Sequence, residues 1–182
     1  KMSRAEILQI KYGQTPHENE AIYLEIIAGK TAHLFSAACR AGALVARNPR
    51  VADLLGTYGL QWGMAFQITD DALDLTSHAE ALGKPIHSDI PGGKITLPVI
   101  RSLQQASAED RARLVRLLST SPRDGQNAEV DALLQRYGGV TYALEVARRY
   151  STDAAGTLEP LAPGLAKASL KLLTEFVLVR AQ

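Results

Sequence analysis

The sequence has little that would build a disulfide scaffold, a membrane span or a strongly charged surface. Cys39 is the single cysteine among 182 residues, which excludes a disulfide framework and a metal site made of cysteines. No apolar run reaches the roughly 20 residues that a transmembrane helix needs, and no signal peptide opens the chain. The net charge of +1 argues against a general surface for nucleic acid or anionic lipid. We therefore expect a cytoplasmic protein that binds any anionic ligand through a few locally placed groups.

Strand-forming and aromatic residues are also scarce. Aromatic residues make up 5% of the chain, and the apolar content of 46% leans on alanine and leucine, which favours helices over strands. Helical spacing of apolar residues predicts helices over 1–12, 18–47, 50–75, 95–105, 109–118, 128–137, 140–158 and 165–179. Gly56, Gly59 and Gly63 lie inside the second long helix, where we expect them to permit close packing with a neighbour. The sequence thus predicts one all-α domain over residues 1–182.

The first helix begins at residue 1, with neither a capping residue nor an initiating methionine ahead of it. A natural domain seldom begins inside a helix. We therefore expect a further N-terminal segment in the intact protein. It is either missing by truncation, removed by cleavage, or carried by a separate chain.

Three aspartates and a glutamine mark the end of the helix over 50–75. Asp70, Asp71 and Asp74 fall within an arc of about 100°, and Gln67 lies inside the same arc. Neighbouring carboxylates repel one another and are costly to desolvate unless cations compensate them. Oxygen ligands of this kind suit Mg²⁺, which commonly shares its coordination with substrate phosphate. A solvated helix end is the alternative, but the surrounding residues are apolar.

The loop over 76–93 adds basic groups to this acidic face. Lys84 and Lys94 each follow a glycine, and Asp89 lies between them. Glycine allows the backbone to approach a ligand, and a lysine ammonium is a strong point charge for phosphate oxygen. Each lysine alone could be an ordinary surface charge. Together with the three aspartates they predict a diphosphate site.

These motifs resemble the second aspartate-rich region of the trans-isoprenyl (polyprenyl) diphosphate synthases. The similarity is carried by Phe66-Gln67-Ile68, Asp70-Asp71-Ala72-Leu73-Asp74, Gly83-Lys84-Pro85, Asp89 and Gly93-Lys94-Ile95-Thr96-Leu97-Pro98. Other matching features are Glu6, Gln9, Lys30-Thr31, Gly138-Gly139 and the closing Phe176-Val177-Leu178-x-Arg180. The resemblance therefore spans the whole chain.

The resemblance implies an isoprenoid-synthase-type helical bundle, of which this chain forms the C-terminal half. It implies a prenyltransferase that elongates an allylic diphosphate with isopentenyl diphosphate by ionisation, condensation and elimination. The implied cofactor is Mg²⁺, with Asp70 and Asp74 as ligands and Asp71 in support. The implied contacts to the allylic diphosphate are Lys30, Lys84 and Lys94. Thr31 and Gln67 would face the substrate and direct oxygen dipoles at the allylic cation.

One part of the family pattern is missing. The family carries an earlier aspartate-rich motif, preceded by basic residues that bind isopentenyl diphosphate, and neither occurs here. We expect an N-terminal half or a partner chain to supply them, and a homodimer is the family's usual assembly. The alternative is a non-catalytic subunit that regulates an active synthase, and a class I terpene cyclase is a weaker one. Overall similarity favours a long-chain product, with C15 or C20 still open.

For two single residues the alternatives remain open. Lys30 lies among apolar residues, where its ammonium could simply extend to solvent. Asp89 could cap a turn instead of binding a metal or a lysine.

Overall fold

The computed structural model describes residues 1–12, 16–76, 95–119 and 126–180. All regular elements within these ranges are helical, which confirms the all-α expectation. Among the described helices, none combines the length and the apolar character that crossing a bilayer requires. The elements are α1 (Met2–Tyr12), α2 (Glu20–Ile27), η1 (Ala28–Ala32), α3 (His33–Val45), η2 (Pro49–Val51), α4 (Ala52–Thr76), α6 (Leu97–Gln105), α7 (Ala108–Ser119), α8 (Gln126–Arg136), α9 (Gly139–Thr157) and α10 (Leu165–Val179).

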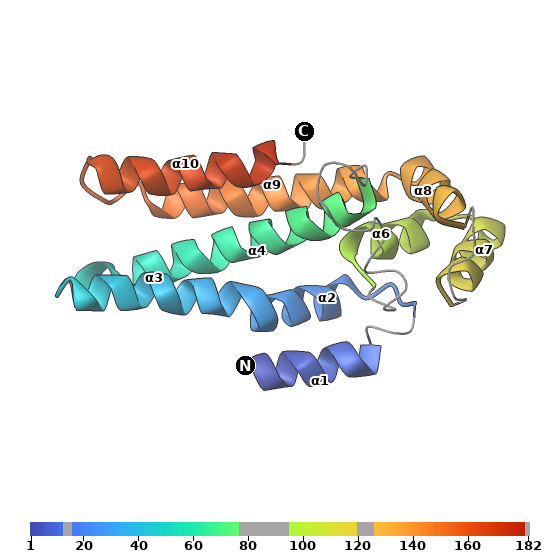
Figure 1. Cartoon of the computed structure of the whole chain (residues 1–182), viewed down its shortest axis with the longest axis horizontal. Helices are drawn as coiled ribbons and strands as arrows, with labels where there is room; N and C mark the ends of the chain where they lie inside the picture. Colours follow the sequence, from blue (N-terminus) through green and yellow to red (C-terminus); the bar gives the residue numbers. More distant parts are fainter. Residues whose placement is uncertain (13–15, 77–94, 120–125, 181–182) are drawn as a thin grey trace.

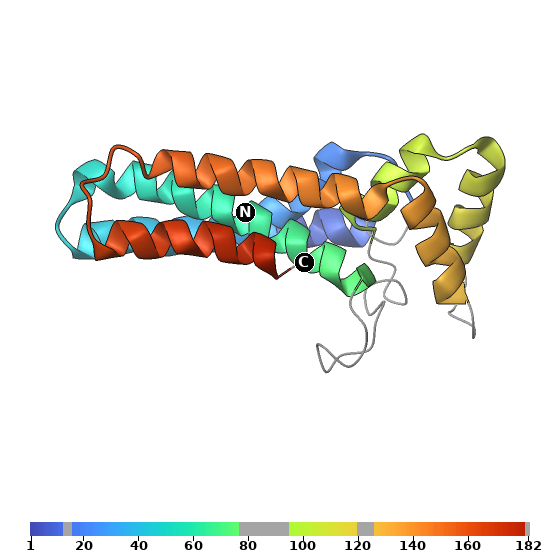
Figure 2. The same cartoon turned by 90° about the horizontal axis from the view of Figure 1, so that it is seen from above.

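The helices form an elongated bundle with α4 at its centre. Helix α4 packs between α3 on one side and α9 on the other, and α10 lies along α9 and also touches α4 (Figures 1 and 2). The short helices α6, α7 and α8 gather at one end, and α1 lies outside α2 and η1 (Figure 1). Because α4 carries the three aspartates, the most enclosed helix of the bundle also carries the predicted chemistry.

Local sequence signals explain where the helices begin. The Asn19 side chain accepts a hydrogen bond from the Ile22 N–H and so caps α2. Pro49 opens η2, a position where its missing N–H costs nothing. Gly138 adopts the left-handed conformation (φ 65°) immediately before α9, which is easy only for glycine.

Two glycines of α4 permit its close approach to η1 and α3. A Cβ at Gly59 would lie 2.6 Å from the Phe35 carbonyl oxygen, and one at Gly63 would lie 2.7 Å from the Ala32 Cα. The expectation of close packing is therefore confirmed at these two positions. It is wrong at Gly56, because a Cβ there would meet Ser36 Oγ at 3.6 Å, an ordinary contact.

The main apolar core lies toward the end of the bundle that carries α6 and α8. It is built around fully buried side chains such as Ile68 of α4, Leu97 and Ile100 of α6, and Leu134 of α8. Burying one such side chain stabilises the fold by about 1.5–3 kcal/mol. The C-terminal half of α4 is thus held on several sides, which fixes the backbone from which the aspartates project.

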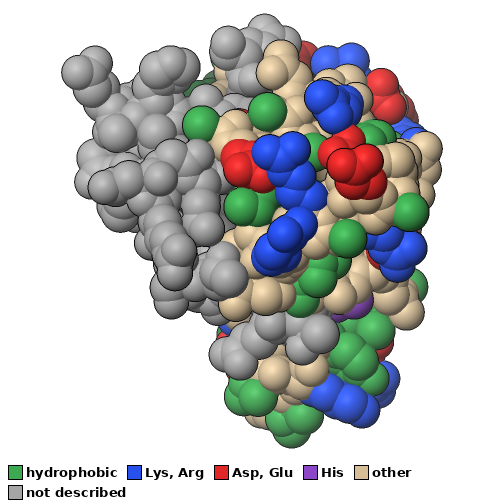
Figure 3. Space-filling model, turned by 90° about the vertical axis from the view of Figure 1, so that its right-hand side faces the viewer, with side chains coloured by type: hydrophobic (Ala, Val, Ile, Leu, Met, Phe, Trp, Pro, Cys, Tyr) green, Lys and Arg blue, Asp and Glu red, His purple; other side chains and the backbone are tan. Residues whose placement is uncertain are grey.

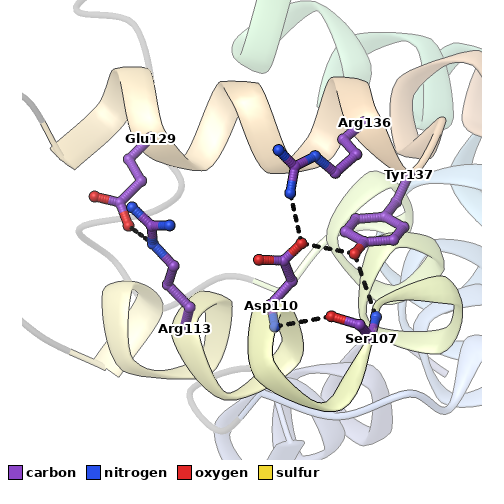
Figure 4. Close-up of polar contacts among 6 residues, drawn as sticks. All are labelled: Ser107, Asp110, Arg113, Glu129, Arg136 and Tyr137. Atoms are coloured by element: carbon purple, nitrogen blue, oxygen red, sulfur yellow. Dashed lines mark hydrogen bonds and ion pairs between the residues drawn. The ribbon is translucent and has the colours of Figure 1, made fainter.

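Charged groups join α7 to α8 at this end of the molecule. Asp110 accepts hydrogen bonds from Arg136 and Tyr137, both at 2.7 Å, and Arg113 pairs with Glu129 (Figure 4). The hydrogen bonds from Tyr137 and Arg136 hold the pKa of Asp110 below its ordinary value. Figure 3 faces this end and shows basic and acidic side chains next to one another on this face.

Apolar side chains are exposed to solvent on α1, α3 and α10, and α3 contributes Leu34, Leu44 and Val45. On α1 they include Ile7 and Ile10, with exposed fractions of 65% and 72%. On α10 they are Leu165, Leu172, Leu173, Phe176 and Val179. Leu172, Phe176 and Val179 recur at helical spacing and so form a continuous face.

Candidate functional site

The turn that carries Lys30 and Thr31 is a π-helix. η1 interrupts the continuous helix that runs from α2 into α3, and it places one additional residue in the turn. Such insertions rotate side chains relative to a regular helix and are frequent at functional sites. The side chain of Lys30 contacts α1, whereas that of Thr31 contacts α4. The sequence predicted a regular helix here, so the π turn is a correction to it.

Side chains of α1 hold the ammonium group of Lys30. Lys30 Nζ donates to Gln9 Oε1 at 2.6 Å and pairs with Glu6 Oε1 at 3.0 Å. The side chain is about one-third exposed (32%). Lys30 therefore does not simply extend to solvent. An ammonium has three donors, so two directed at α1 leave one for a ligand.

A chain of hydrogen bonds links α2, η1 and α4. Thr31 Oγ1 donates to Gln67 Oε1 at 2.7 Å, and Gln67 Nε2 donates to Asp71 Oδ1 at 3.0 Å. Tyr23 donates its phenolic hydrogen to Asp71 Oδ2 at 2.7 Å. Because the carboxylate of Asp71 can only accept, the amide of Gln67 must turn its nitrogen toward Asp71 and its oxygen toward Thr31.

Asp71 occupies a different environment from the other two aspartates. It is buried, with an exposed fraction of 1%, and its carboxylate points toward Tyr23 of α2. Donors on both oxygens offset the cost of burying the negative charge. The structure thus separates Asp71 from Asp70 and Asp74 and gives it contacts that fix the Gln67 amide.

Asp70 and Asp74 lie one turn apart on the outer side of α4. The side chain of Asp70 is 53% exposed, and its Oδ1 lies 3.5 Å from Arg180 Nη2. Asp74 is half-buried. These two carboxylates therefore remain on the face where an ion and a substrate could reach them.

The donor set of Asp70 and Asp74 fits a hard divalent cation. Both offer carboxylate oxygens, the ligand type that Mg²⁺ prefers. Within the ranges that the structure describes, no three His, Cys, Asp or Glu side chains are grouped to enclose a metal ion. Mg²⁺ usually binds one or two carboxylates and completes its shell with water and substrate phosphate. The pair therefore suits Mg²⁺ as a partial ligand set.

Aromatic rings cover α4 just before the acidic residues. Trp62 stacks on Phe66 with ring centroids 5.4 Å apart, and Phe35 meets Trp62 edge-on at 4.8 Å. The indole N–H of Trp62 donates to the Leu173 carbonyl oxygen of α10 at 2.9 Å. Both Trp62 and Phe66 are partly buried, so they pack between helices and also border the face that carries Asp70.

Some predicted residues lie outside the described ranges, and one contributor was not predicted. Lys84, Asp89 and Lys94 fall within residues 77–94, which the structure does not describe. Tyr23 was missed, because a lone tyrosine in an apolar stretch gives no sign that it will meet a carboxylate far along the chain.

Comparison with known proteins gives consistent matches along this chain. The family model described as Polyprenyl synthetase matches residues 1–136. The short chain isoprenyl diphosphate synthase of Methanothermobacter thermautotrophicus is 38% identical over 181 residues, which cover 99% of this chain. The decaprenyl diphosphate synthase structure from Rhodobacter capsulatus superposes over 100% of this chain with a TM-score of 0.90 and 31% identity. A polyprenyl synthase from Caulobacter crescentus, solved with calcium and isoprenyl diphosphate, also gives 0.90, at 30% identity over 100% of this chain.

These proteins are all longer than the present chain. The chain spans 55% of the Methanothermobacter protein and 56% of each of the two solved structures. The relatives thus contain a large part that has no counterpart in these 182 residues.

Proposed function

The chain belongs to the polyprenyl synthetase family, and from this premise we propose that it supplies the Mg²⁺-dependent ionisation part of a prenyltransferase. The reaction proposed is elongation of an allylic diphosphate by isopentenyl diphosphate. The observation that carries the proposal is the hydrogen-bond chain from Thr31 through Gln67 to Asp71, on the helix that bears Asp70 and Asp74. This arrangement orients a neutral oxygen dipole beside a pair of carboxylates.

In the proposed reaction the allylic C–O bond breaks, and its electron pair leaves with the diphosphate. The π electrons of isopentenyl diphosphate then form the new C–C bond, and loss of a proton from the condensed cation restores a double bond. Mg²⁺ held by Asp70 and Asp74 would supply Lewis-acid neutralisation of the departing charge. The Caulobacter structure, with calcium and isoprenyl diphosphate, supports a divalent cation in the family.

Lys30 is proposed to contact the allylic diphosphate. Its ammonium is held by Gln9 and Glu6, so it does not have to be ordered when the substrate arrives. A positioned cation stabilises the charge that develops on the leaving group more than the same cation in water would. We assign Lys84 and Lys94 the same role by family resemblance.

Thr31 and Gln67 are proposed to steady the allylic cation. The Gln67 amide oxygen points toward Thr31, and the amide nitrogen is occupied by Asp71. An oriented carbonyl dipole attracts positive charge without reorganising during the reaction. Asp71 acts through Gln67 in this proposal and is a positioning residue, whereas Asp70 and Asp74 are metal ligands.

The isopentenyl diphosphate site is proposed to be completed by a segment outside this chain. The relatives are nearly twice as long, and α1 and α10 expose apolar side chains, including Ile10 and Phe176, that an added helix could bury. An N-terminal half of the same protein or a partner chain carrying the first aspartate-rich motif would satisfy both observations. Homodimerisation of the complete protein is proposed on family grounds.

The proposed product is a long-chain linear prenyl diphosphate, as in the decaprenyl diphosphate synthase that this chain resembles. Similarity to a short chain synthase makes C15 or C20 the alternative. Chromatography of the products from labelled isopentenyl diphosphate, made by the protein with its complementing half, separates these lengths.

The same assay tests the function. We expect Mg²⁺-dependent elongation that falls by at least about a hundredfold in Asp70→Asn and in Asp74→Asn. Full activity of either variant in the assembled enzyme would favour a non-catalytic subunit. A cyclic hydrocarbon product would point to a cyclase.

A further inference from the structure

The guanidinium of Arg180, at the end of α10, lies over two residues of α4 that are one turn apart. Its Nη2 is 3.5 Å from Asp70 Oδ1, and its Cζ is 5.3 Å from the centroid of the Phe66 ring. The side chain is 28% exposed, against 53% for Asp70. Arg180 therefore covers part of the carboxylate that the proposed function assigns to Mg²⁺.

We propose that Arg180 is a positioning residue that competes with the metal ion for Asp70 and couples metal binding to release of the end of α10. The inference rests on the proposed function, because it takes Asp70 as a metal ligand. The competing charge comes from the end of α10, whereas Asp70 lies on α4.

Electrostatics explains the competition. The guanidinium of an arginine stays positively charged at physiological pH, so it is a permanent competitor for a cation near Asp70. A divalent ion at Asp70 would lie within a few ångströms of the guanidinium, and the two cations repel strongly at that range. Binding of the ion must therefore weaken the contact between Arg180 and Asp70. By linkage, that contact must weaken metal binding by the same factor.

The aromatic ring of Phe66 holds Arg180 in this position. A guanidinium over an aromatic face gains cation–π attraction, and the planar group suits stacking better than a lysine ammonium. Phe66 itself stacks on Trp62, whose indole N–H bonds to the Leu173 carbonyl of α10. The end of α10 is thus tied to α4 through Asp70, Phe66 and Trp62 together.

The fluorescence of Trp62 reports on the contact between Arg180 and Phe66. Trp62 is the single tryptophan of the chain, and it lies between the Phe66 ring and the α10 backbone. Displacement of Arg180 changes what covers Phe66 and therefore the surroundings of the indole. Trp62 fluorescence should respond to Mg²⁺ in the wild-type chain and should not respond in Asp70→Asn.

The test is a titration of the 182-residue chain with Mg²⁺ alone, in which binding is measured by calorimetry and by the fluorescence of Trp62. Arg180→Gln should bind Mg²⁺ about five- to tenfold more tightly than wild type at low ionic strength. In about 0.5 M salt this gain in affinity should be smaller, because the salt screens the repulsion between the two cations. Arg180→Lys keeps the charge but loses the planar stack and should fall between the two. Arg148→Gln, on the exposed face of α9, is the matched control and should leave the affinity within about twofold.

The outcomes separate this inference from the proposed function. If Arg180→Gln and wild type bind Mg²⁺ equally while Asp70→Asn binds at least about tenfold more weakly, the competition is disproved and the metal site stands. If neither wild type nor Arg180→Gln binds Mg²⁺, the metal assignment fails and the inference fails with it. Tighter binding by Arg180→Gln that disappears in the double variant with Asp70→Asn supports both.

Discussion

The phenolic hydroxyl of Tyr23 donates a 2.7 Å hydrogen bond to the buried carboxylate of Asp71, which lies 48 residues further along the chain. This bond joins α2 to α4 next to the turn that carries Lys30 and Thr31. It holds the carboxylate that in turn orients the Gln67 amide. The contact is therefore both a structural tie and the base of the proposed cation-stabilising group.

Tyr23→Phe should lower the free energy of unfolding by about 1–3 kcal/mol, because it removes a donor from a buried carboxylate. Urea unfolding of the chain measures the loss. Tyr12→Phe, on the outer helix α1, is the matched control and should change the free energy by less than about 0.5 kcal/mol. Equal stability of Tyr23→Phe and wild type would mean that the bond contributes nothing.

Gln67→Leu should reduce turnover more than it raises the Michaelis constant for the allylic diphosphate. In the proposed function the amide dipole acts on charge that exists only in the transition state, so kcat should fall by about tenfold or more while KM changes by less than about threefold. Steady-state kinetics of the complete enzyme measures both constants. Gln105→Leu, at the exposed end of α6, controls for the loss of an amide. A loss confined to KM would instead assign Gln67 to ground-state binding.

Two glycine substitutions on α4 should have opposite effects on stability. Gly63→Ala places a Cβ 2.7 Å from the Ala32 Cα and should destabilise the chain by about 1–3 kcal/mol. Gly56→Ala meets only an ordinary contact at 3.6 Å and should stabilise α4 by up to about 1 kcal/mol through helix propensity. Thermal unfolding of the pair checks this. Similar melting temperatures for both variants would refute the close approach of η1 and α4 at Gly63.

The α7–α8 contacts should make stability depend on acid pH. The pKa of Asp110 is lowered by hydrogen bonds from Tyr137 and Arg136, so the folded chain favours the ionised carboxylate. The contribution is present above the ordinary carboxyl pKa and is lost as the pH falls through the lower pKa of the folded chain. Urea unfolding from about pH 7 to about pH 2 measures this contribution. The free energy of unfolding should fall less over this range in Asp110→Asn than in wild type. Parallel curves for the two proteins would exclude the effect.

The fold could be predicted from the sequence because its signals are local and repeated. Apolar residues at helical spacing, with glycine and proline breaks, predicted the helix over 165–179 that the structure has as α10. The shared helix face of Asp70 and Asp74 could be predicted for the same reason, because their spacing alone places them one turn apart.

The remaining features depend on contacts between distant segments. Spacing within α4 placed Asp71 on the same face as Asp70 and Asp74, but its burial against Tyr23 depends on how α2 packs. The π turn at Ala28–Ala32 gives no periodic signal, because one additional residue is invisible in a short apolar run. The position of Arg180 over Phe66 likewise follows from the docking of α10 on α4.

In the proposed function Asp70 and Asp74 bind an allylic diphosphate through Mg²⁺, and every other proposed role depends on this binding. Calorimetric titration of the chain with geranyl diphosphate, once in the presence of Mg²⁺ and once in the presence of EDTA, tests this binding most directly. We predict binding that requires Mg²⁺ and weakens by at least about tenfold in the Asp70→Asn/Asp74→Asn double variant. Equal affinity in EDTA, or an unchanged affinity in the double variant, would contradict the account.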